Sequence, residues 1–198
     1  MHFTGERVVP HDMGDRPDVL SEHLIRYAIA LRWCSAANIL DVACGTGYGM
    51  AMIRPIAQRI WGGDIDDNSL NYARANYGLK DLCKIDLSTQ SIQTVFKRKF
   101  DIIISFETIE HIENPKYFMN SVRESLLPGG YFIFSVPVSN ESEFHKSVFS
   151  YNKSINLGNN LFKEHKTFIQ TASYLIPKEL IVSKMSSFAG LYIIRIMQ

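Results

Sequence analysis

Two hydrophobic patterns alternate along the chain. Short apolar runs that end in turn residues predict buried strands, and apolar residues at three- and four-residue steps predict amphipathic helices. The first pattern predicts strands over residues 38–43, 59–65, 82–86, 100–107, 131–137, 165–171 and 190–197. The second predicts helices over residues 19–34, 48–58, 68–78 and 115–127. Because strands alternate with helices, we expect an α/β fold with an open, mostly parallel sheet and right-handed crossovers.

Turn residues mark several of the predicted helix ends. Asn68 or Asp67 is a candidate N-cap for the helix over residues 68–78, and Gly78 is a candidate stop. Pro55 lacks a backbone donor, so it should kink or end the helix over residues 48–58. The sequence LLPGG predicts the end of the fourth helix and a tight turn into the fifth strand.

A chain of 198 residues is most economically a single domain, and it contains no internal repeat or low-complexity linker. We divide the domain into an N-terminal arm and helix over residues 1–35 and a core over residues 36–137. Residues 138–198 form the remainder. We expect this part to supply the last two strands and a lid over the substrate.

Composition narrows the classes of protein to consider. The formal net charge is +1, so no overall field draws the chain to nucleic acid or to an anionic membrane. No apolar run approaches the ~18 residues that a membrane helix needs, and the first residues are too polar for a secretory signal. The three cysteines form no CxxC pair, which favours reduced thiols. We therefore expect a cytoplasmic protein that does not insert into a membrane.

The stretch ILDVACGTGYGM places three glycines directly after the first predicted strand. A glycine there lets a cofactor approach the backbone and permits a positive φ. Asp64 stands at the end of the second predicted strand, where a carboxylate can accept hydrogen bonds from two ribose hydroxyls. Asp86 ends the third strand, within reach of an adenine amino group. The alternative is that these acids are solvated turn residues and that Asp86 caps a helix.

Two residues indicate which cofactor the turn accepts. A dinucleotide fingerprint requires a glycine at the sixth position of the motif, and Met50 stands there instead. Asp41 precedes the glycines and could hold an ammonium group, but it would repel a pyrophosphate. S-adenosylmethionine carries the ammonium and lacks the pyrophosphate, so the residues favour it.

Four motifs resemble those of class I S-adenosylmethionine-dependent methyltransferases, most closely the small-molecule enzymes of the ubiquinone-biosynthesis type. The motifs are LDVACGTGYG, GGDID, KFDIIISFETIEHIENP and LLPGGYFIFSVP, which together cover residues 36–137. The opening segments TGERVVP and EHLIRYAIA are similar to a narrower branch of enzymes that O-methylate sugars or sugar phosphates in bacterial polysaccharide pathways. The resemblance implies a Rossmann-like fold with a seven-stranded, mostly parallel sheet and helices on both faces.

The resemblance also implies roles for individual residues. The methionine part of the cofactor would be lined by Asp41, Ala43, Gly45 and Gly47. Asp64 would bind the ribose, and the adenine would lie beside Ile65, Asp86 and Leu87. The methionine moiety and the mouth of the substrate site would be flanked by Phe106 and Glu107. Arg26 could pair with the cofactor carboxylate, or it could simply be a surface charge on an amphipathic helix.

Methyl transfer to an alcohol also calls for a general base, because the hydroxyl must lose its proton. His111, which follows the fourth strand, and His145, in SEFH after the fifth, are the candidate catalytic residues. Related enzymes often carry an NPFH-like segment at the second position, so the correspondence there is partial. Glu107 or Glu110 could serve instead, and either histidine could be structural. No convincing metal-ligand cluster stands out, so we expect no metal.

The predicted function is therefore methyl transfer from S-adenosylmethionine to a small acceptor, such as a glycan or sugar nucleotide. Three alternatives remain open. One is a nicotinamide-dependent oxidoreductase, which Met50 and Asp41 disfavour, and another is a catalytically silent methyltransferase-like subunit. The third is a nucleic-acid methyltransferase, but the chain lacks a basic stripe and the Asn/Asp-Pro-Pro-aromatic motif.

Overall fold

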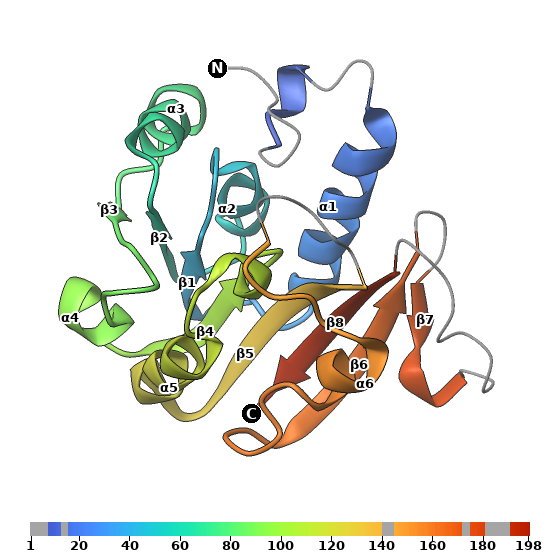
Figure 1. The fold of residues 1–198 in the computed structure, drawn as a ribbon. Coiled ribbons are helices and arrows are strands. Elements are labelled where there is room, and N and C mark those ends of the chain that lie inside the picture. Colours follow the sequence, from blue (N-terminus) through green and yellow to red (C-terminus); the bar gives the residue numbers. More distant parts are fainter. Residues whose placement is uncertain (1–7, 13–15, 140–144, 172–174, 181–190) are drawn as a thin grey trace.

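A single eight-stranded sheet forms the centre of the computed structural model, which describes residues 8–12, 16–139, 145–171, 175–180 and 191–198 (Figure 1). The order of the strands is β3-β2-β1-β4-β5-β8-β6-β7. Their bounds are β1 Asn38–Val42, β2 Arg59–Asp64, β3 Leu82–Lys84, β4 Phe100–Ser105, β5 Leu126–Val138, β6 Glu164–Gln170, β7 Leu175–Pro177 and β8 Leu191–Met197.

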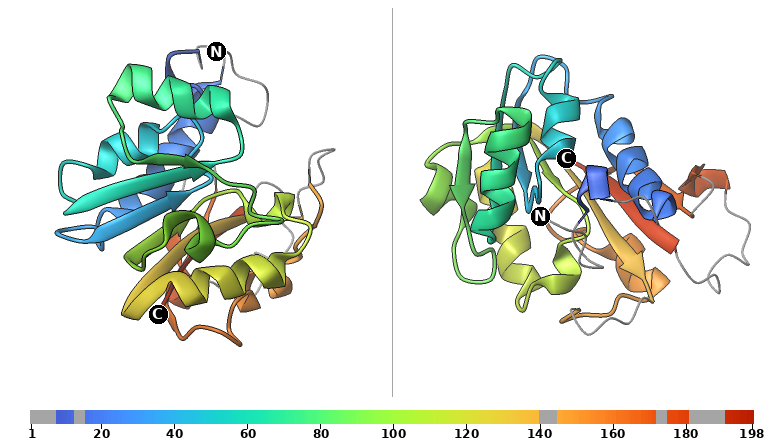
Figure 2. Two further views of the ribbon diagram at one scale, coloured as in Figure 1. Left: turned by 90° about the vertical axis from the view of Figure 1, so that its left-hand side faces the viewer. Right: turned by 90° about the horizontal axis from the view of Figure 1, so that it is seen from above.

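Helices cover both faces of this sheet, as the views from the side and from above show (Figure 2). The first face carries α1 (Pro17–Ala30), α2 (Tyr48–Ile53) and α3 (Asp67–Tyr77). The second face carries α4 (Ile92–Phe96), α5 (Pro115–Ser125) and α6 (Tyr151–Asn156). Three short 3-10 helices complete the described elements: η1 (Pro10–Asp12), η2 (Ile109–His111) and η3 (Lys178–Leu180). Within the described residues, no helix combines the length and the apolar character that crossing a bilayer would require.

The central strands are apolar at successive positions because both of their faces are buried. In β4, Phe100 and Ile103 pack into the core beneath α4 and α5, whereas Ile102 and Ile104 pack toward α1 and α2. This arrangement confirms the α/β fold with helices on both faces that the hydrophobic pattern predicts.

The direction of strand succession reverses between β1 and β4. Strands β1, β2 and β3 follow one another toward one edge, whereas β4 and β5 lie on the other side of β1, and all five run parallel. In open α/β sheets, ligands bind beyond the carboxyl ends of the strands at such a switch point. The sheet departs from the expected seven strands by the short strand β7, which pairs antiparallel with β6.

Several helix ends differ from the predictions. Asp66 caps α3 by accepting hydrogen bonds from the amides of Asn68 and Ser69, so neither Asn68 nor Asp67 is the cap. Gly78 ends α3 as predicted. The helix predicted over residues 48–58 ends at Ile53, shortly before Pro55. The helix predicted over residues 115–127 ends at Ser125, and LLPGG bulges within β5 between its pairings with Phe100 and Ile102.

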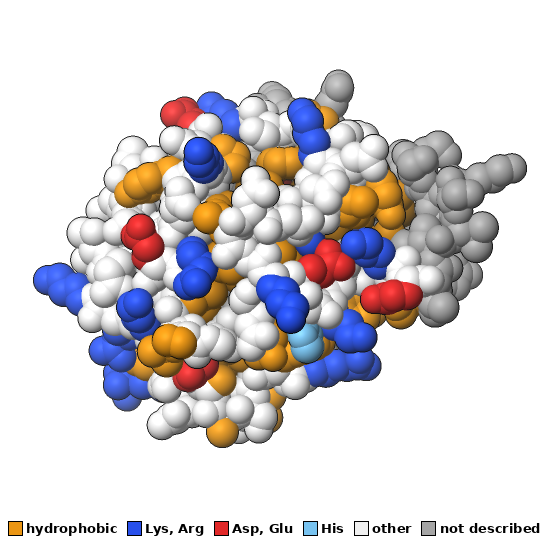
Figure 3. Space-filling model, turned by 90° about the horizontal axis from the view of Figure 1, so that it is seen from below, with side chains coloured by type: hydrophobic (Ala, Val, Ile, Leu, Met, Phe, Trp, Pro, Cys, Tyr) orange, Lys and Arg blue, Asp and Glu red, His pale blue; other side chains and the backbone are white. Residues whose placement is uncertain are grey.

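The charged surface is mixed on the face shown in Figure 3, where Lys and Arg side chains lie among acidic, polar and hydrophobic ones. Two arginines pack against the ring of Trp61. The guanidinium groups of Arg59 and Arg98 lie 4.8 and 4.4 Å from the centre of the Trp61 ring. Arg59 also pairs with Asp81 at 2.7 Å. Arg98, in the basic run before β4, therefore packs against an aromatic side chain.

Gly47 provides a test of how α2 and α3 pack. Its φ is 82°, and an added Cβ would lie 2.7 Å from the Ala73 Cβ of α3 and 2.8 Å from Leu79. We expect Gly47→Ala to lower the free energy of unfolding by about 2–4 kcal/mol, measured by urea denaturation. Gly78→Ala is the matched control, because its φ is 62° but no atom lies within 4 Å of an added Cβ. The Gly78→Ala substitution should lower the free energy of unfolding by about 1 kcal/mol. Equal losses would show that α3 moves aside.

Candidate functional site

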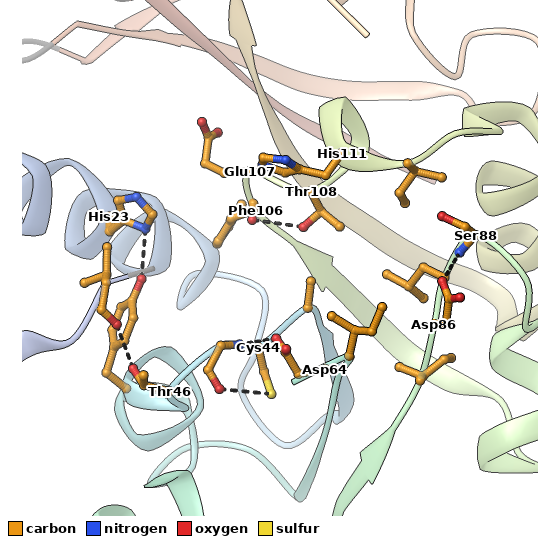
Figure 4. A pocket seen from close by; sticks show the side chains of 18 of the residues that line it. His23, Cys44, Thr46, Asp64, Asp86, Ser88, Phe106, Glu107, Thr108 and His111 are labelled. Atoms are coloured by element: carbon orange, nitrogen blue, oxygen red, sulfur yellow. Dashed lines mark hydrogen bonds between the residues drawn. The ribbon is translucent and has the colours of Figure 1, made fainter. Parts of the chain in front are cut away.

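A cavity of about 590 Å³ lies at the carboxyl ends of β1, β2, β3 and β4, on the switch point of the sheet (Figure 4). The loops after these strands line it, together with α1 and the segment before η1. Its lining residues are Val8, His23, Tyr27, Ala43, Cys44, Gly45, Thr46, Tyr48, Asp64, Ile65, Ile85, Asp86, Leu87, Ser88, Phe106, Glu107, Thr108, His111 and Ile112. The strand-end residues expected from the sequence therefore meet in one place.

Asp64 connects the ends of β1 and β2. One of its carboxylate oxygens accepts a hydrogen bond from the Gly45 amide at 2.8 Å, and the other accepts one from the Asp66 amide at 2.9 Å. Gly45 has a φ of 54°, and an added Cβ would meet no atom within 4 Å. The glycine is thus required by the turn, and the space beside its backbone is open. Asp64 presents a fixed carboxylate to this space, as ribose binding requires.

Gly47 lies at the same turn but does not line the cavity. It faces α3 and Leu79. Its contact with a methionine moiety stays a prediction, and packing against α3 explains the need for glycine. Met50 is likewise fully buried, with its sulfur over Gly62 of β2, 2.4 Å from where a Cβ on that glycine would stand. The close helix–strand contact therefore depends on a glycine of the strand.

Asp41 lies beneath the cavity and is fully buried. The period of two along β1 turns it toward α1, where the Tyr27 hydroxyl donates a hydrogen bond of 2.9 Å to its carboxylate. Burial, with a smaller effect from the negative charge of Asp64, raises the pKa of Asp41 to about 7, against the opposing effect of the Tyr27 hydrogen bond. Asp41 was expected to line the methionine part of the cofactor, but Tyr27 lines the cavity in its place and bonds to Asp41.

The end of the cavity near β3 combines apolar and polar groups. Ile65 is 59% exposed, an unusual state for a large aliphatic side chain, and Leu87 lies on the same cavity wall. The Asp86 carboxylate accepts hydrogen bonds from the Ser88 amide and the Thr89 hydroxyl, both at 2.9 Å. Asp86 therefore stabilises its own turn while also lining the cavity, and it is not the helix cap of the alternative interpretation, because Ser91 caps α4.

Backbone strain marks the end of β4. Glu107 has a φ of 50°, which is uncommon for a residue other than glycine. Two hydrogen bonds hold it there. Its amide donates to the Ser135 hydroxyl at 3.1 Å, and that hydroxyl donates to the Glu107 carboxylate at 2.5 Å. The preceding ring, Phe106, packs edge-on against Tyr27 with 5.0 Å between ring centres. The structure thus fixes Glu107 at the rim of the cavity.

Arg26 is not brought to the cavity. It is fully buried and donates a hydrogen bond of 3.2 Å to the side chain of Gln170 in β6, and its guanidinium lies 4.7 Å from the centre of the Tyr192 ring. It is therefore not the surface charge that the amphipathic pattern allowed. Its pairing with the cofactor carboxylate stays a prediction without support from this arrangement.

The two candidate histidines lie together. His111 ends η2 and lines the cavity. His145 is outside the cavity lining, but its ring centre is 5.0 Å from that of His111. The side chain of Glu110 completes a group whose possible ligand atoms all lie within 4.8 Å of one another. The sequence analysis treated these residues as separate candidate bases, whereas the structure brings them together; the expectation of no metal stays a prediction.

The sequence analysis missed a second wall of the cavity, built by α1 and the N-terminal arm. Nδ1 of His23 lies 2.9 Å from the Tyr48 hydroxyl. Burial, with a smaller effect from the charge of Arg26, lowers the pKa of His23 well below its usual value. The Thr46 hydroxyl donates to the carbonyl of Val8 at 2.9 Å and so ties the arm to the glycine turn. The one available signal was the spacing of His23 and Tyr27, which share a helix face.

Comparisons with known proteins agree with this geometry. Residues 40–134 match the family model described as a methyltransferase domain. A probable S-adenosylmethionine-dependent methyltransferase from Mycolicibacterium smegmatis is 28% identical over 135 residues, which are 68% of this chain and 51% of the relative. A ubiquinone biosynthesis O-methyltransferase from Hydrogenovibrio crunogenus is 26% identical over 159 residues, 79% of this chain and 62% of that protein. The chain thus spans about half the length of the first relative.

Solved structures of other proteins share this fold. The crystal structure of the N-methyltransferase NodS from Bradyrhizobium japonicum, in complex with S-adenosyl-L-homocysteine, superposes with a TM-score of 0.71 at 14% identity. The match covers 98% of this chain and 94% of that protein. This likeness shows a shared fold. The family match and the curated relatives support the predicted class, a class I S-adenosylmethionine-dependent methyltransferase, with S-adenosylmethionine as the cofactor.

The raised pKa of Asp41 predicts a pH dependence of stability. The pKa moves from 3.8 to about 7 on folding, so the folded state binds more protons than the unfolded chain between these values. Stability is therefore present in full below about pH 4 and declines as the pH rises toward 7, by roughly 3–4 kcal/mol from this group. Urea denaturation across this window should show the decline in the wild type and a smaller one in Asp41→Asn. Parallel profiles would refute the assignment to Asp41.

Proposed function

We propose that this chain transfers the methyl group of S-adenosylmethionine to a hydroxyl oxygen of a small acceptor, such as a sugar, a sugar phosphate or a related metabolite. The observation that carries the proposal is the single cavity in which an anchored Asp64 faces the glycine turn on one side. Glu107 and His111 stand at the opposite side (Figure 4). Cofactor and acceptor can thus meet in one space that the sheet and α1 enclose.

The cofactor would extend across the strand ends. Asp64 would accept the ribose hydroxyls, since its carboxylate is already oriented by two backbone amides. The adenine would cover the exposed side chain of Ile65 and lie against Leu87, which explains why a large aliphatic side chain stands at a cavity wall. Asp86 would border it at the adenine amino group.

The methionine moiety would then lie between the turn at Ala43 and Gly45 and the ring of Phe106. Tyr27 lines this part, and its hydroxyl donates its proton to Asp41, so the oxygen lone pairs would be left to accept from the cofactor ammonium. The buried carboxylate would thereby act on the ammonium through Tyr27. This arrangement explains how Asp41 can matter although it does not reach the cavity.

Transfer is an in-line displacement. The acceptor oxygen forms a bond to the methyl carbon while the carbon–sulfur bond breaks, and the electron pair stays on sulfur. The protein aligns the oxygen at roughly 3–3.5 Å from the methyl carbon and excludes water. The hydroxyl proton must leave during the step, and His111 is the group at the cavity that we propose assists its loss, with His145 beside it.

One observation supports a sugar-like acceptor, and another supports transfer to oxygen. The segments TGERVVP and EHLIRYAIA resemble enzymes that methylate sugars in polysaccharide pathways, although residues 4–7 of the first lie outside the described part of the chain. The relative from Hydrogenovibrio crunogenus is named an O-methyltransferase. NodS, by contrast, is named an N-methyltransferase, but its likeness to this chain is one of fold.

Cofactor binding provides the first test. In calorimetric titrations, S-adenosylhomocysteine and S-adenosylmethionine should bind in the micromolar range and NAD should not bind. Asp64→Asn keeps an oxygen for the turn but loses the charge, and it should weaken S-adenosylhomocysteine binding by about 1–3 kcal/mol. Asp66→Asn is the control, because asparagine caps a helix as well as aspartate does. Equal affinity in the wild type and Asp64→Asn would remove the ribose role.

Turnover provides the second test. Sugar nucleotides, sugar phosphates and glycans, supplied with labelled S-adenosylmethionine, should include an acceptor that gains one methyl group. With that acceptor, His111→Ala should lower kcat by about 10²–10⁴-fold while S-adenosylhomocysteine affinity is retained. The control is His165→Ala, an exposed histidine of β6 that does not line the cavity. Cofactor binding without methylation of any acceptor hydroxyl would favour the catalytically silent alternative.

A further inference from the structure

The group formed by Glu110, His111 and His145 lies beside the acceptor side of the cavity. Its possible ligand atoms are a carboxylate oxygen and two imidazole nitrogens, all within 4.8 Å of one another. Nε2 of His111 is 3.9 Å from a carboxylate oxygen of Glu110. His111 also lines the cavity, so the group opens onto the space where the acceptor is proposed to bind.

Backbone hydrogen bonds build this group from two distant segments. The turn η2 makes Glu110 and His111 consecutive on a rigid 3-10 helix. The carbonyl of Glu110 accepts hydrogen bonds from the amides of Lys146 and Ser147 at 2.8 and 3.0 Å. These two bonds hold the chain immediately after His145 against η2. The meeting of the two histidines is therefore a consequence of main-chain pairing, which does not depend on the side chains themselves.

The donor set suits a particular kind of cation. Two imidazoles and one carboxylate are typical ligands of divalent first-row transition metals, whereas magnesium and calcium prefer oxygen ligands alone. Glu110 is 1% exposed. A buried carboxylate attracts a cation more strongly than an exposed one, because the surroundings screen its charge less. The carboxylate and neutral imidazoles would leave a bound divalent ion with one net positive charge.

The distances allow such an ion after a small adjustment. Ligands that share an ion at 2.0–2.2 Å lie about 3–3.5 Å apart in a tetrahedral site. The widest separation in the group is 4.8 Å, so a shift of about 1 Å in the side chains would close it. His111 and His145 are both only partly buried, which leaves room for these rotations. Three protein ligands also leave an open position for an oxygen of a substrate.

We infer that Glu110, His111 and His145 bind one divalent first-row transition metal ion, such as Zn²⁺, Mn²⁺ or Co²⁺, at the acceptor side of the cavity. The inference deepens the proposed function and its catalytic part rests on it. The ion would take the acceptor hydroxyl at its open position and lower the pKa of that hydroxyl, so that its proton is lost to bulk water when the acceptor binds, before the oxygen attacks the methyl carbon. The histidines then act as metal ligands and not as free bases.

Metal binding is tested directly with the full chain, prepared without a histidine tag and treated with a chelator. Titration with Co²⁺, followed by visible absorption, and with Zn²⁺, followed by calorimetry, should each show one equivalent bound. His145→Ala and Glu110→Gln should weaken binding at least tenfold while S-adenosylhomocysteine affinity is kept, which shows that the variants are folded. His165→Ala should bind the metal as the wild type does.

Each result has a separate meaning. Absence of stoichiometric binding, or equal binding by the wild type and both variants, overturns the metal site. Metal binding that depends on these residues, in a chain that fails to bind S-adenosylhomocysteine, supports the site and refutes the proposed function. If turnover is found, chelation should abolish it and added metal should restore it in the wild type but not in His145→Ala. Turnover that survives chelation refutes the catalytic role of the metal ion, and His111 then keeps its proposed role as the general base.

Discussion

The hydrogen bond between the Gly45 amide and the Asp64 carboxylate connects the ends of two parallel strands, and the rest of the cavity is arranged around it. Because β1 and β2 are neighbours in register, their loops leave the sheet side by side. The bond orients the carboxylate toward the open space above Gly45, and the Asp66 amide holds its other oxygen. A charged group that is oriented before the ligand arrives loses little entropy on binding. This one polar contact thus orients the carboxylate that we propose binds the cofactor at the switch point of the sheet.

The two sides of the cavity are held by different means. On the side of α1, buried aromatic rings and the pair formed by Tyr27 and Asp41 create a rigid wall whose carboxylate is costly to ionise. On the side of β4, a left-handed Glu107 is held by Ser135, and the carbonyl of Glu110 holds the segment after His145. The strained residue and the paired histidines therefore stand where the acceptor is proposed to react. In the proposed function, the rigid wall on the side of α1 binds the cofactor, and methyl transfer to the acceptor takes place on the side of β4.

Much of the fold and part of the site could be predicted from local pattern. The buried strands are apolar on successive residues, which distinguishes them from helices, and the strand ends lie where the glycines and acids occur. Asp64 could be placed because the carboxyl ends of parallel strands share one edge of the sheet. The short helices α4 and α6 were missed because five or six residues carry too little periodicity. The end of α5 was misplaced because LLPGG bulges within β5.

The sequence by itself determined the class of fold, the cofactor and the strand-end residues, because these depend on periodicity and on spacing within short segments. Only the tertiary structure decided that Asp41 faces Tyr27, that Gly47 is needed for packing against α3, and that Arg26 is buried by Gln170. It alone brought His145 to His111 across the 33 residues that separate them in the sequence. These contacts join residues distant in sequence, and they are set by how helices pack on the sheet and how backbone groups find partners, which no local pattern encodes.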